Sequence, residues 1–198
     1  LEEGKREGEG ACIWPNGSIY QGNWLNDKFH GYGRLVTDMG DIYEGEWVKG
    51  SFQGLGTYKG RDGCKYEGSW FQDCQHGYGK EHWPDGAYYE GDYVDGKMEG
   101  YGKFRLSNGD IYEGEFKNSR FEGKGTYIYA VGGRRYIGEF KDGLKDGYGE
   151  FYWGDGREYK GEYMKGKKWG KGIFRWDDGR SFEGEWENGI ALVNNNLI

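Results

Sequence analysis

The sequence predicts an all-β fold: an elongated, single-layer antiparallel meander of about eight 23-residue β-hairpin repeats, twisted and grooved, with a core of aromatic rings and glycines. An aromatic residue recurs every 23 residues, with a single step of 24. Glycine follows it two positions later, and a second aromatic follows at four. With 41 glycines, 19% aromatics and few aliphatics, only the rings can supply the core. The opening aromatics are Tyr20, Tyr43, Tyr66, Tyr89, Tyr112, Tyr136, Tyr159 and Phe182.

This frame predicts a single repeat array over residues 1–198. A half repeat covers 1–19, full repeats start at 20, 43, 66, 89, 112, 136 and 159, and a partial terminal repeat covers 182–198. The chain has no initiator methionine and starts inside a repeat. We therefore expect it to be part of a longer array.

The first strand of each repeat carries the opening aromatic, the glycine and the second aromatic, as in Tyr112, Gly114 and Phe116. A spacing of two residues places these side chains on one face of a strand. The intervening column is mostly acidic, as at Glu115, and is expected to form a solvated outer face. Helix is disfavoured because each glycine would cost it about 1 kcal/mol.

The second strand begins with a Gly-x-Gly sequence such as Gly100-Tyr101-Gly102 and continues with further rings. A loop of about five residues, such as 118–122, is expected between the two strands of a repeat. Asn-Gly or Asp-Gly turns connect successive repeats, because these dipeptides accept positive φ. The extra residue near 131–133 falls in such a turn, where an insertion is tolerated.

One physical reason explains why glycine and aromatic columns occur together. A glycine facing a ring leaves bare backbone on which the ring can lie flat. Burying one large apolar side chain contributes about 1.5–3 kcal/mol, so a continuous ring ladder would be the main stabilising term. A single sheet must twist or curl to cover these rings.

The pattern Tyr-x-Gly-x-Trp, followed by Gly-x-Gly and an Asn/Asp-Gly turn, resembles the MORN (membrane occupation and recognition nexus) repeat. The resemblance covers essentially the whole chain, and the first glycine column is filled in every copy. An array made only of such repeats is similar to the cytoskeletal MORN proteins of protists, notably the apicomplexan basal-complex scaffold. The resemblance implies a non-enzymatic scaffold, and the family name implies membranes.

Composition excludes several classes of function. A net charge of −7 argues against nucleic-acid binding and predicts weak or absent binding to phospholipid. Three cysteines, an odd number, do not make a disulfide framework and favour a reducing compartment, so we expect a cytoplasmic protein. The resemblance to MORN proteins implies association with the cytoskeleton or membrane skeleton. The acidic residues recur in register on the outer face, which predicts no catalytic acid–base pair and no enzymatic activity. No cofactor is expected, apart from a zinc candidate.

Cys74 and His76 form that candidate. Cys74 occupies a column otherwise held mainly by Lys or Arg. One Cys-x-His is half of a tetrahedral zinc site, so two chains would be needed to complete it at a dimer contact. The alternative is an exposed free thiol.

Four lysines around Trp169 form the best candidate for an anionic ligand, namely Lys165, Lys167, Lys168 and Lys171. The alternative is a solvated rim whose cations are balanced by neighbouring carboxylates. A separate feature lies on the outer face, where tyrosines fill the position between paired glycines. With four apolar residues of the loops they would form an exposed partner surface. The tyrosines are Tyr32, Tyr78, Tyr101 and Tyr148, and the loop residues are Phe29, Phe52, Met98 and Phe121.

The interpretation that fits best is a scaffold that homodimerises and binds other cytoskeletal or scaffold proteins, in cell division if the narrower resemblance holds. The alternative is a phosphoinositide-binding membrane module. The terminal strand 180–186 is expected to have no second strand, because 191–193 lacks Gly-x-Gly. Such an unpaired edge favours pairing between chains. The predicted dimer contacts are Phe182, Trp186, Trp169 and Trp176.

Overall fold

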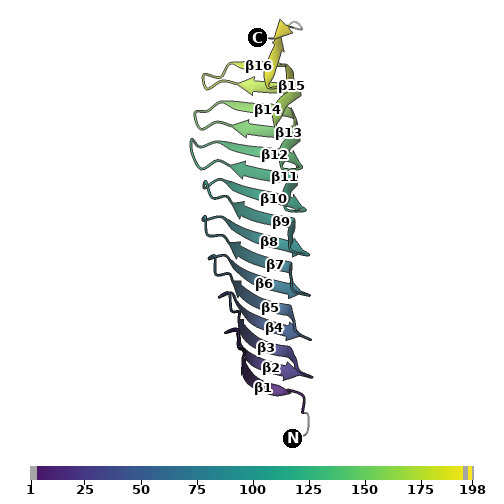
Figure 1. Ribbon diagram of the computed structural model, residues 1–198. Helices are drawn as coiled ribbons and strands as arrows, with labels where there is room; N and C mark the ends of the chain where they lie inside the picture. The colour runs from purple at the N-terminus through teal and green to yellow at the C-terminus, as the bar shows by residue number, and fades with distance from the viewer. Residues whose placement is uncertain (1–3, 194–195, 198) are drawn as a thin grey trace. The chain divides into compact units, whose positions relative to one another are not determined.

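The computed structural model describes residues 4–193 and 196–197. In this part of the chain every regular element is a β-strand and none is a helix. Residue contacts divide the chain into two compact units, Leu1–Lys97 and Met98–Ile198, called here the N-terminal and C-terminal units. Within each unit, consecutive strands pair antiparallel in chain order (Figure 1). The predicted all-β antiparallel meander of hairpins is confirmed.

The N-terminal unit contains β1 (Gly8–Ile13), β2 (Ile19–Leu25), β3 (Lys28–Val36), β4 (Ile42–Val48), β5 (Ser51–Lys59), β6 (Lys65–Phe71), β7 (Cys74–His82) and β8 (Tyr88–Val94). The C-terminal unit begins within β9 (Lys97–Arg105) and continues with β10 (Ile111–Lys117), β11 (Arg120–Ile128), β12 (Arg135–Lys141), β13 (Leu144–Tyr152), β14 (Glu158–Met164), β15 (Lys167–Arg175), β16 (Ser181–Glu187), β17 (Ile190–Val193) and β18 (Asn196–Leu197).

The connection inside a repeat is a two-residue turn, so the expected loop of about five residues is wrong. Between β10 and β11 the turn consists of Asn118 and Ser119, with φ of 49° and 61°. Positive φ at both central residues defines the type I′ turn that matches the twist of paired strands. The other residues of the expected loop belong to β11, whose Phe121 lies opposite Phe116.

A β-bulge in the second strand explains the difference. In the hairpin of β10 and β11, Gly114 lies opposite Gly125, whereas Glu115 lies opposite Glu122. Two extra residues therefore bulge out of β11, one of them Gly123, with φ of 57°. The bulge changes which residues face inward, and it brings the first residues of the strand into pairing with the end of the preceding strand.

A row of glycines runs across the strands of each unit. Each glycine lies opposite another glycine, and the ring that covers the pair comes from two positions earlier on the first strand. Tyr112 is fully buried in this way, and its hydroxyl donates a hydrogen bond to the Glu115 carbonyl at 2.8 Å. The row consists of Gly10, Gly22, Gly33, Gly45, Gly56, Gly68, Gly79 and Gly91 in the N-terminal unit, and of Gly102, Gly114, Gly125, Gly138, Gly149, Gly161, Gly172 and Gly184 in the C-terminal unit.

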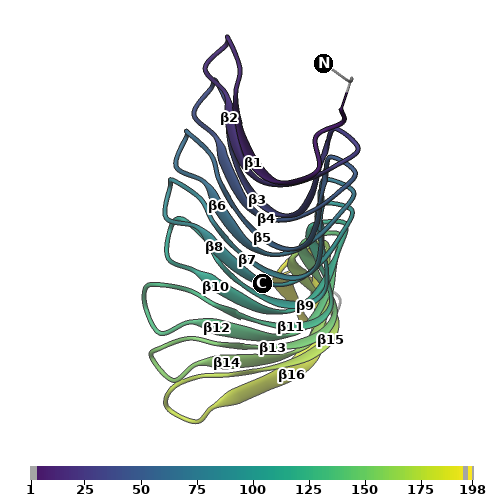
Figure 2. The same cartoon turned by 90° about the horizontal axis from the view of Figure 1, so that it is seen from below.

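Packing on this row forms the predicted ring ladder. The second aromatic of a repeat meets the opening tyrosine edge to face, with ring centroids 4.9 Å apart for Tyr43 and Trp47. The indole of Trp47 also donates a hydrogen bond to the Gly33 carbonyl at 3.0 Å. Edge-to-face contacts of this kind add to the free energy of burial. The strands of each unit curve along their length, as a single sheet must to cover its rings (Figure 2).

The predicted turns between repeats are confirmed. In the turn after β9, the Asn108 side chain accepts a hydrogen bond from the backbone NH of Asp110 at 3.0 Å. The extra residue near 131–133 lies in the turn between β11 and β12, where Tyr129 NH reaches the Arg134 carbonyl at 3.0 Å. It is accommodated there without changing the pairing of Gly125 with Gly138.

Candidate functional site

The outer faces of both units expose tyrosines between the paired glycines. Tyr32 and Tyr78 are 57% and 52% exposed in the N-terminal unit, and Tyr101 and Tyr148 are 59% and 52% exposed in the C-terminal unit. We call these four residues the outer tyrosines. The hydroxyl of Tyr32 donates to Glu44 at 3.2 Å, and Tyr78 donates likewise to Glu90. These bonds orient the rings, which remain available to a partner.

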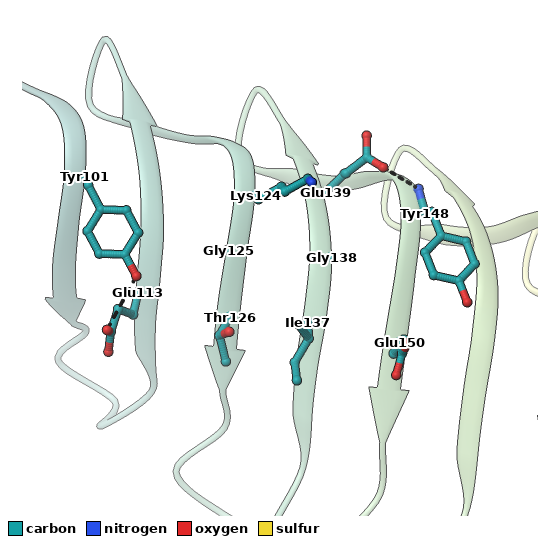
Figure 3. Close-up of a pocket in the computed structure, with 10 residues that line it drawn as sticks. All are labelled: Tyr101, Glu113, Lys124, Gly125, Thr126, Ile137, Gly138, Glu139, Tyr148 and Glu150. Atoms are coloured by element: carbon teal, nitrogen blue, oxygen red, sulfur yellow. Dashed lines mark hydrogen bonds between the residues drawn. The ribbon is translucent and has the colours of Figure 1, made fainter.

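In the C-terminal unit two outer tyrosines flank a shallow cavity of about 450 Å³ (Figure 3). Tyr101 lies at one end and Tyr148 at the other, with Gly125 and Gly138 on the floor between them. Carboxylates dominate its charged lining, which contains Glu113, Glu139, Glu150 and Lys124. The cavity lining thus combines two exposed aromatic rings with mostly acidic side chains.

The acidic column next to the glycine row does more than face solvent. A Glu115 carboxylate oxygen accepts a hydrogen bond from the bulged Lys124 NH at 3.1 Å. Glu46 does the same for Leu55 at 3.0 Å in the N-terminal unit. Both glutamates are exposed on the outer face, as predicted, and in addition they satisfy the backbone of the bulge.

Phe29, Phe52 and Phe121 lie on the inner, aromatic face, so their expected place in outer-face loops is wrong. Phe29 stacks on Tyr20 with centroids 3.8 Å apart, Phe52 on Tyr43 at 3.7 Å, and Phe121 on Tyr112 at 3.8 Å. The reason is the bulge, which turns these residues inward. Met98 occupies the same column of the repeat.

In the sixth and seventh full repeats this inward column holds lysine. Lys145 lies over the rings of Tyr129, Tyr136, Phe151 and Tyr163, its ammonium 4.5–6.0 Å from their centroids. The ammonium also donates a hydrogen bond to the Tyr129 hydroxyl at 2.8 Å. Burial lowers the pKa of Lys145 to about 8.

Lys168 has the same environment one repeat later. Its ammonium lies 4.5–5.0 Å from the ring centroids of Trp153, Tyr159, Phe174 and Trp186. Burial lowers its pKa to about 8, helped by the nearby charge of Arg157. The sequence analysis did not predict that Lys145 and Lys168 are each surrounded by aromatic rings. The signal was available, because the column is mostly apolar in the other repeats and should have been assigned inward.

The four lysines predicted as an anionic site are not brought together, so that cluster is wrong as a single site. Lys168 is on the aromatic face, whereas Lys171 lies opposite Glu185 on the outer face. Lys165 occupies the turn before β15, where its NH donates to Asp146 at 3.0 Å, and Lys167 is the exposed first residue of β15. The bulge separates side chains that are close in sequence.

Cys74 and His76 both lie at the start of β7. Cys74 is an exposed free thiol, and the His76 Nδ1 is 3.5 Å from a carboxylate oxygen of Asp95. Within the described residues, no group of three or more Cys, His, Asp or Glu could hold a metal ion in one chain. The two-chain zinc site stays a prediction.

Three of the predicted dimer residues surround one cavity of about 440 Å³ on the aromatic face at β15–β17. Trp176, Phe182 and Trp186 line it, and Trp169 does not. Trp186 is 8% exposed and Trp176 is 38% exposed. We call this space the end cavity.

The expected missing partner strand is wrong in part, because β17 pairs with Glu185–Glu187 of β16. The residues Ile190–Val193 can pair without a Gly-x-Gly sequence because no tyrosine ring has to lie over them. In the described residues, the Ser181–Gly184 half of β16 pairs with β15 alone.

The repeating hairpins, the glycine rows and the ring ladder define an open, solenoid-like repeat protein. The profile of the MORN repeat matches residues 1–19, 20–42, 43–65, 66–88, 89–111, 112–134, 136–156, 159–179 and 182–191. The chain therefore belongs to the MORN repeat family, as the sequence pattern predicted. A search of curated proteins finds no match.

Solved structures show distant similarity. The G-box domain of the microcephaly protein CPAP is 11% identical, with a TM-score of 0.46 over 91% of this chain and 100% of that chain. The TCP domain of Drosophila melanogaster SAS-4, solved with a proline-rich motif of Ana2, is 14% identical, with a TM-score of 0.44 over 94% and 93% of the two chains. At this level they carry no argument about function. In the described part of the chain, no helix is long and apolar enough to cross a membrane.

Proposed function

We propose that this chain is a non-enzymatic scaffold that forms homodimers and binds other cytoskeletal or scaffold proteins. The observation that carries the proposal is the open aromatic end cavity, where Trp176 is 38% exposed beside the half-paired strand β16. Exposed aromatic residues next to a strand edge favour association with another chain. The outer tyrosines offer a second, separate surface for partner proteins.

The favourable free energy of dimerisation would come mainly from burial of Trp176 and Phe182. Trp186 is only 8% exposed in the single chain, so it has little surface left to bury. Burying a fully exposed ring contributes about 1.5–3 kcal/mol, and these rings, which are already partly covered, would each contribute a fraction of that. Two copies related by a twofold axis would bury each end cavity against the other. Trp169, which lies outside the cavity, would contact the partner only at the periphery.

Light scattering tests the homodimer directly. We expect the wild-type chain to have twice the monomer mass, and Trp176→Ser with Phe182→Ser to have the monomer mass. Leu55→Ser is the matched control, since Leu55 is 64% exposed in the other unit and should leave the dimer intact. A monomeric wild type would contradict the proposal.

The zinc-linked contact is a second mode of the same proposal. Chelator treatment and Cys74→Ser should leave the mass unchanged if the end cavity is the interface. If the dimer is lost in these samples and persists in the Trp176/Phe182 variant, the interface is at Cys74 and His76 instead.

We expect weak or absent binding to neutral and anionic vesicles in co-sedimentation at physiological salt. The net charge is −7, and the four lysines around Trp169 lie on different faces. The alternative function, a phosphoinositide-binding module, requires a concentrated positive surface. Tight binding that is lost in Lys165→Glu with Lys167→Glu would favour that alternative.

The proposed location is the cytoplasm, in association with the cytoskeleton or membrane skeleton. A role in cell division, as in the apicomplexan basal-complex scaffold, belongs to the same proposal and rests on the sequence resemblance alone. Localisation of the tagged full-length protein tests both.

A further inference from the structure

Among the described residues, two cations on the aromatic face of the C-terminal unit have no anionic partner. In the described part of the chain, the Lys145 ammonium has one hydrogen-bond acceptor, the Tyr129 hydroxyl, and the Lys168 ammonium lies against rings. The charged groups that act on them are themselves cationic: Arg134 for Lys145 and Arg157 for Lys168. A lysine ammonium has three donors, and a partly buried charge without a counter-ion is costly.

The N-terminal unit also has a charged side chain on its aromatic face, but there the charge is hydrogen-bonded within the chain. Glu81 also lies on the aromatic face, where its carboxylate accepts a hydrogen bond from the Tyr93 hydroxyl at 2.7 Å and is further bonded by Gln75. Gln75 occupies the column that holds Lys145 and Lys168 in the C-terminal unit. Glu81 therefore has hydrogen-bond partners within the chain, whereas the two lysines have no counter-ion among the described residues.

Each lysine opens into a cavity with aromatic walls. The cavity at Lys145 measures about 190 Å³ and includes Phe121, Tyr127 and Tyr129. Lys168 lines the end cavity of about 440 Å³. The smaller one is below the roughly 300–1,000 Å³ of a typical small-molecule site, so it fits a single side chain.

The spacing of the two lysines sets a second constraint. They occupy equivalent positions on β13 and β15, and at about 4.8 Å per strand they lie about 10 Å apart across the face. Seven residues of an α-helix also span about 10 Å and return to the same side of the helix.

We propose that the aromatic face of the C-terminal unit binds an acidic, apolar peptide segment of a partner protein, with Lys145 and Lys168 each receiving one carboxylate. The charged groups that act on the two ammonium groups are Arg134 and Arg157, whereas the whole chain carries −7, so this surface attracts acidic segments. The nearby Asp110 carboxylate is already bonded by the Tyr127 hydroxyl and the Ala130 NH. The rings around each ammonium bury the apolar parts of the same segment. This inference names the chemistry of a partner and rests on the proposed protein-binding role.

The test uses the whole chain and a fluorescein-labelled, alanine-based helical peptide with two glutamates seven residues apart, flanked by leucines. Fluorescence anisotropy should detect binding, and the peptide with both glutamates changed to glutamine should bind at least about tenfold more weakly. Lys145→Met and Lys168→Met should each weaken binding by a similar factor, and the double variant should abolish it. Methionine also fills this column at position 98, so the variants should fold.

Lys124→Met and Lys167→Met are the matched controls, since they remove the same charge from exposed positions and should bind like the wild type. Equal affinity for the two peptides, or wild-type affinity in the double variant, would overturn the proposal. Binding of anionic vesicles, instead of the peptide, that requires Lys145 and Lys168 would also overturn it. The second copy of the chain and the peptide would compete for the end cavity that Lys168 lines, so anisotropy is measured at protein concentrations at which light scattering gives the monomer mass. Loss of peptide binding under those conditions contradicts this proposal alone, and a monomer mass at every concentration contradicts the homodimer alone.

The pH dependence provides an independent readout. Both lysines have a pKa lowered to about 8, so affinity should fall as pH rises from about 7 to 9.5. The other groups around them are arginines and tyrosines whose pKa is raised by burial, and these keep their charge state over that range. A flat profile would contradict carboxylate binding by the lysines. The groups are Arg134, Tyr129, Tyr136 and Tyr163 around Lys145, and Arg157 and Tyr159 around Lys168.

Discussion

Gly114→Val is expected to lower the free energy of unfolding of the C-terminal unit by about 3 kcal/mol or more. A Cβ at Gly114 would lie 2.5 Å from the Gly125 Cα, 2.6 Å from the Lys124 carbonyl oxygen and 2.7 Å from the Tyr112 hydroxyl. The first two atoms are backbone and cannot move aside without breaking the pairing of β10 with β11. Urea denaturation followed by far-UV circular dichroism measures the loss.

Two neighbours on the same strand serve as controls. Glu113→Val removes an exposed ion pair with Lys103 at 3.7 Å and should cost less than about 1 kcal/mol. Glu115→Val removes the acceptor of the bulged Lys124 NH and should cost about 1–3 kcal/mol. Equal stability of the Gly114 and Glu113 variants would contradict the packing of the glycine row.

The ring ladder could be predicted because its causes repeat in every copy. A strand spacing of two assigns Tyr112, Gly114 and Phe116 to one face, and the close approach of Tyr112 to Gly125 permits only glycine there. The turn between repeats could also be predicted, because the Asn108 side chain readily bonds the backbone of a turn and Gly109 readily adopts positive φ. These features depend on local chemistry that one repeat already contains.

The inner position of Lys145 and Lys168 could not be read in the same way. Alternation predicts facing only until a bulge interrupts it, and the bulge at Gly123 is formed by a positive φ that the sequence marks only as another glycine. The expected loop at 118–122 therefore placed Phe121 and its column outside. Comparing the column across repeats would have exposed the error, since Phe29, Phe52 and Phe121 share it with the lysines.

The pairing of β16 with β17 shows a different limit. Gly-x-Gly is required where a tyrosine ring covers the second strand, as Tyr159 covers Gly172. Phe182 has no hydroxyl to bond to a carbonyl, and β17 pairs only with Glu185–Glu187 beyond the glycine row. The missing Gly-x-Gly sequence thus indicates that no tyrosine ring packs on this strand. It does not indicate that the strand is absent.

Buried tyrosines make the fold sensitive to alkali. The opening tyrosines are 0–2% exposed, and burial raises the pKa of Tyr20 to about 12 and that of the others further. The ordinary pKa of tyrosine is about 10, so above that pH the unfolded chain loses phenol protons that the folded chain keeps. The residues concerned are Tyr20, Tyr43, Tyr66, Tyr112, Tyr136 and Tyr159.

We therefore expect cooperative unfolding as pH rises above about 10. Each pKa unit corresponds to about 1.4 kcal/mol, so the summed effect of these tyrosines reaches the roughly 5–15 kcal/mol stability of a typical domain. Between pH about 8 and 10 the sign is opposite, because Lys145 and Lys168 have a folded-state pKa of about 8, below the ordinary value of 10.5. There the unfolded chain binds more protons, and stability rises with pH, by up to about 5 kcal/mol for the two lysines with the same conversion.

Urea midpoints across this pH range, together with phenolate absorbance and circular dichroism, measure both effects. Phenolate from the buried tyrosines should appear together with the loss of β-structure, whereas Tyr32 and Tyr101, at 57% and 59% exposure, should ionise without unfolding the chain. Lys145→Met with Lys168→Met should remove the rise between pH about 8 and 10 and leave the collapse above it, because the collapse depends on the tyrosines alone. If every tyrosine ionises while the β-structure persists, the tyrosine rings are not buried against the glycine row as described.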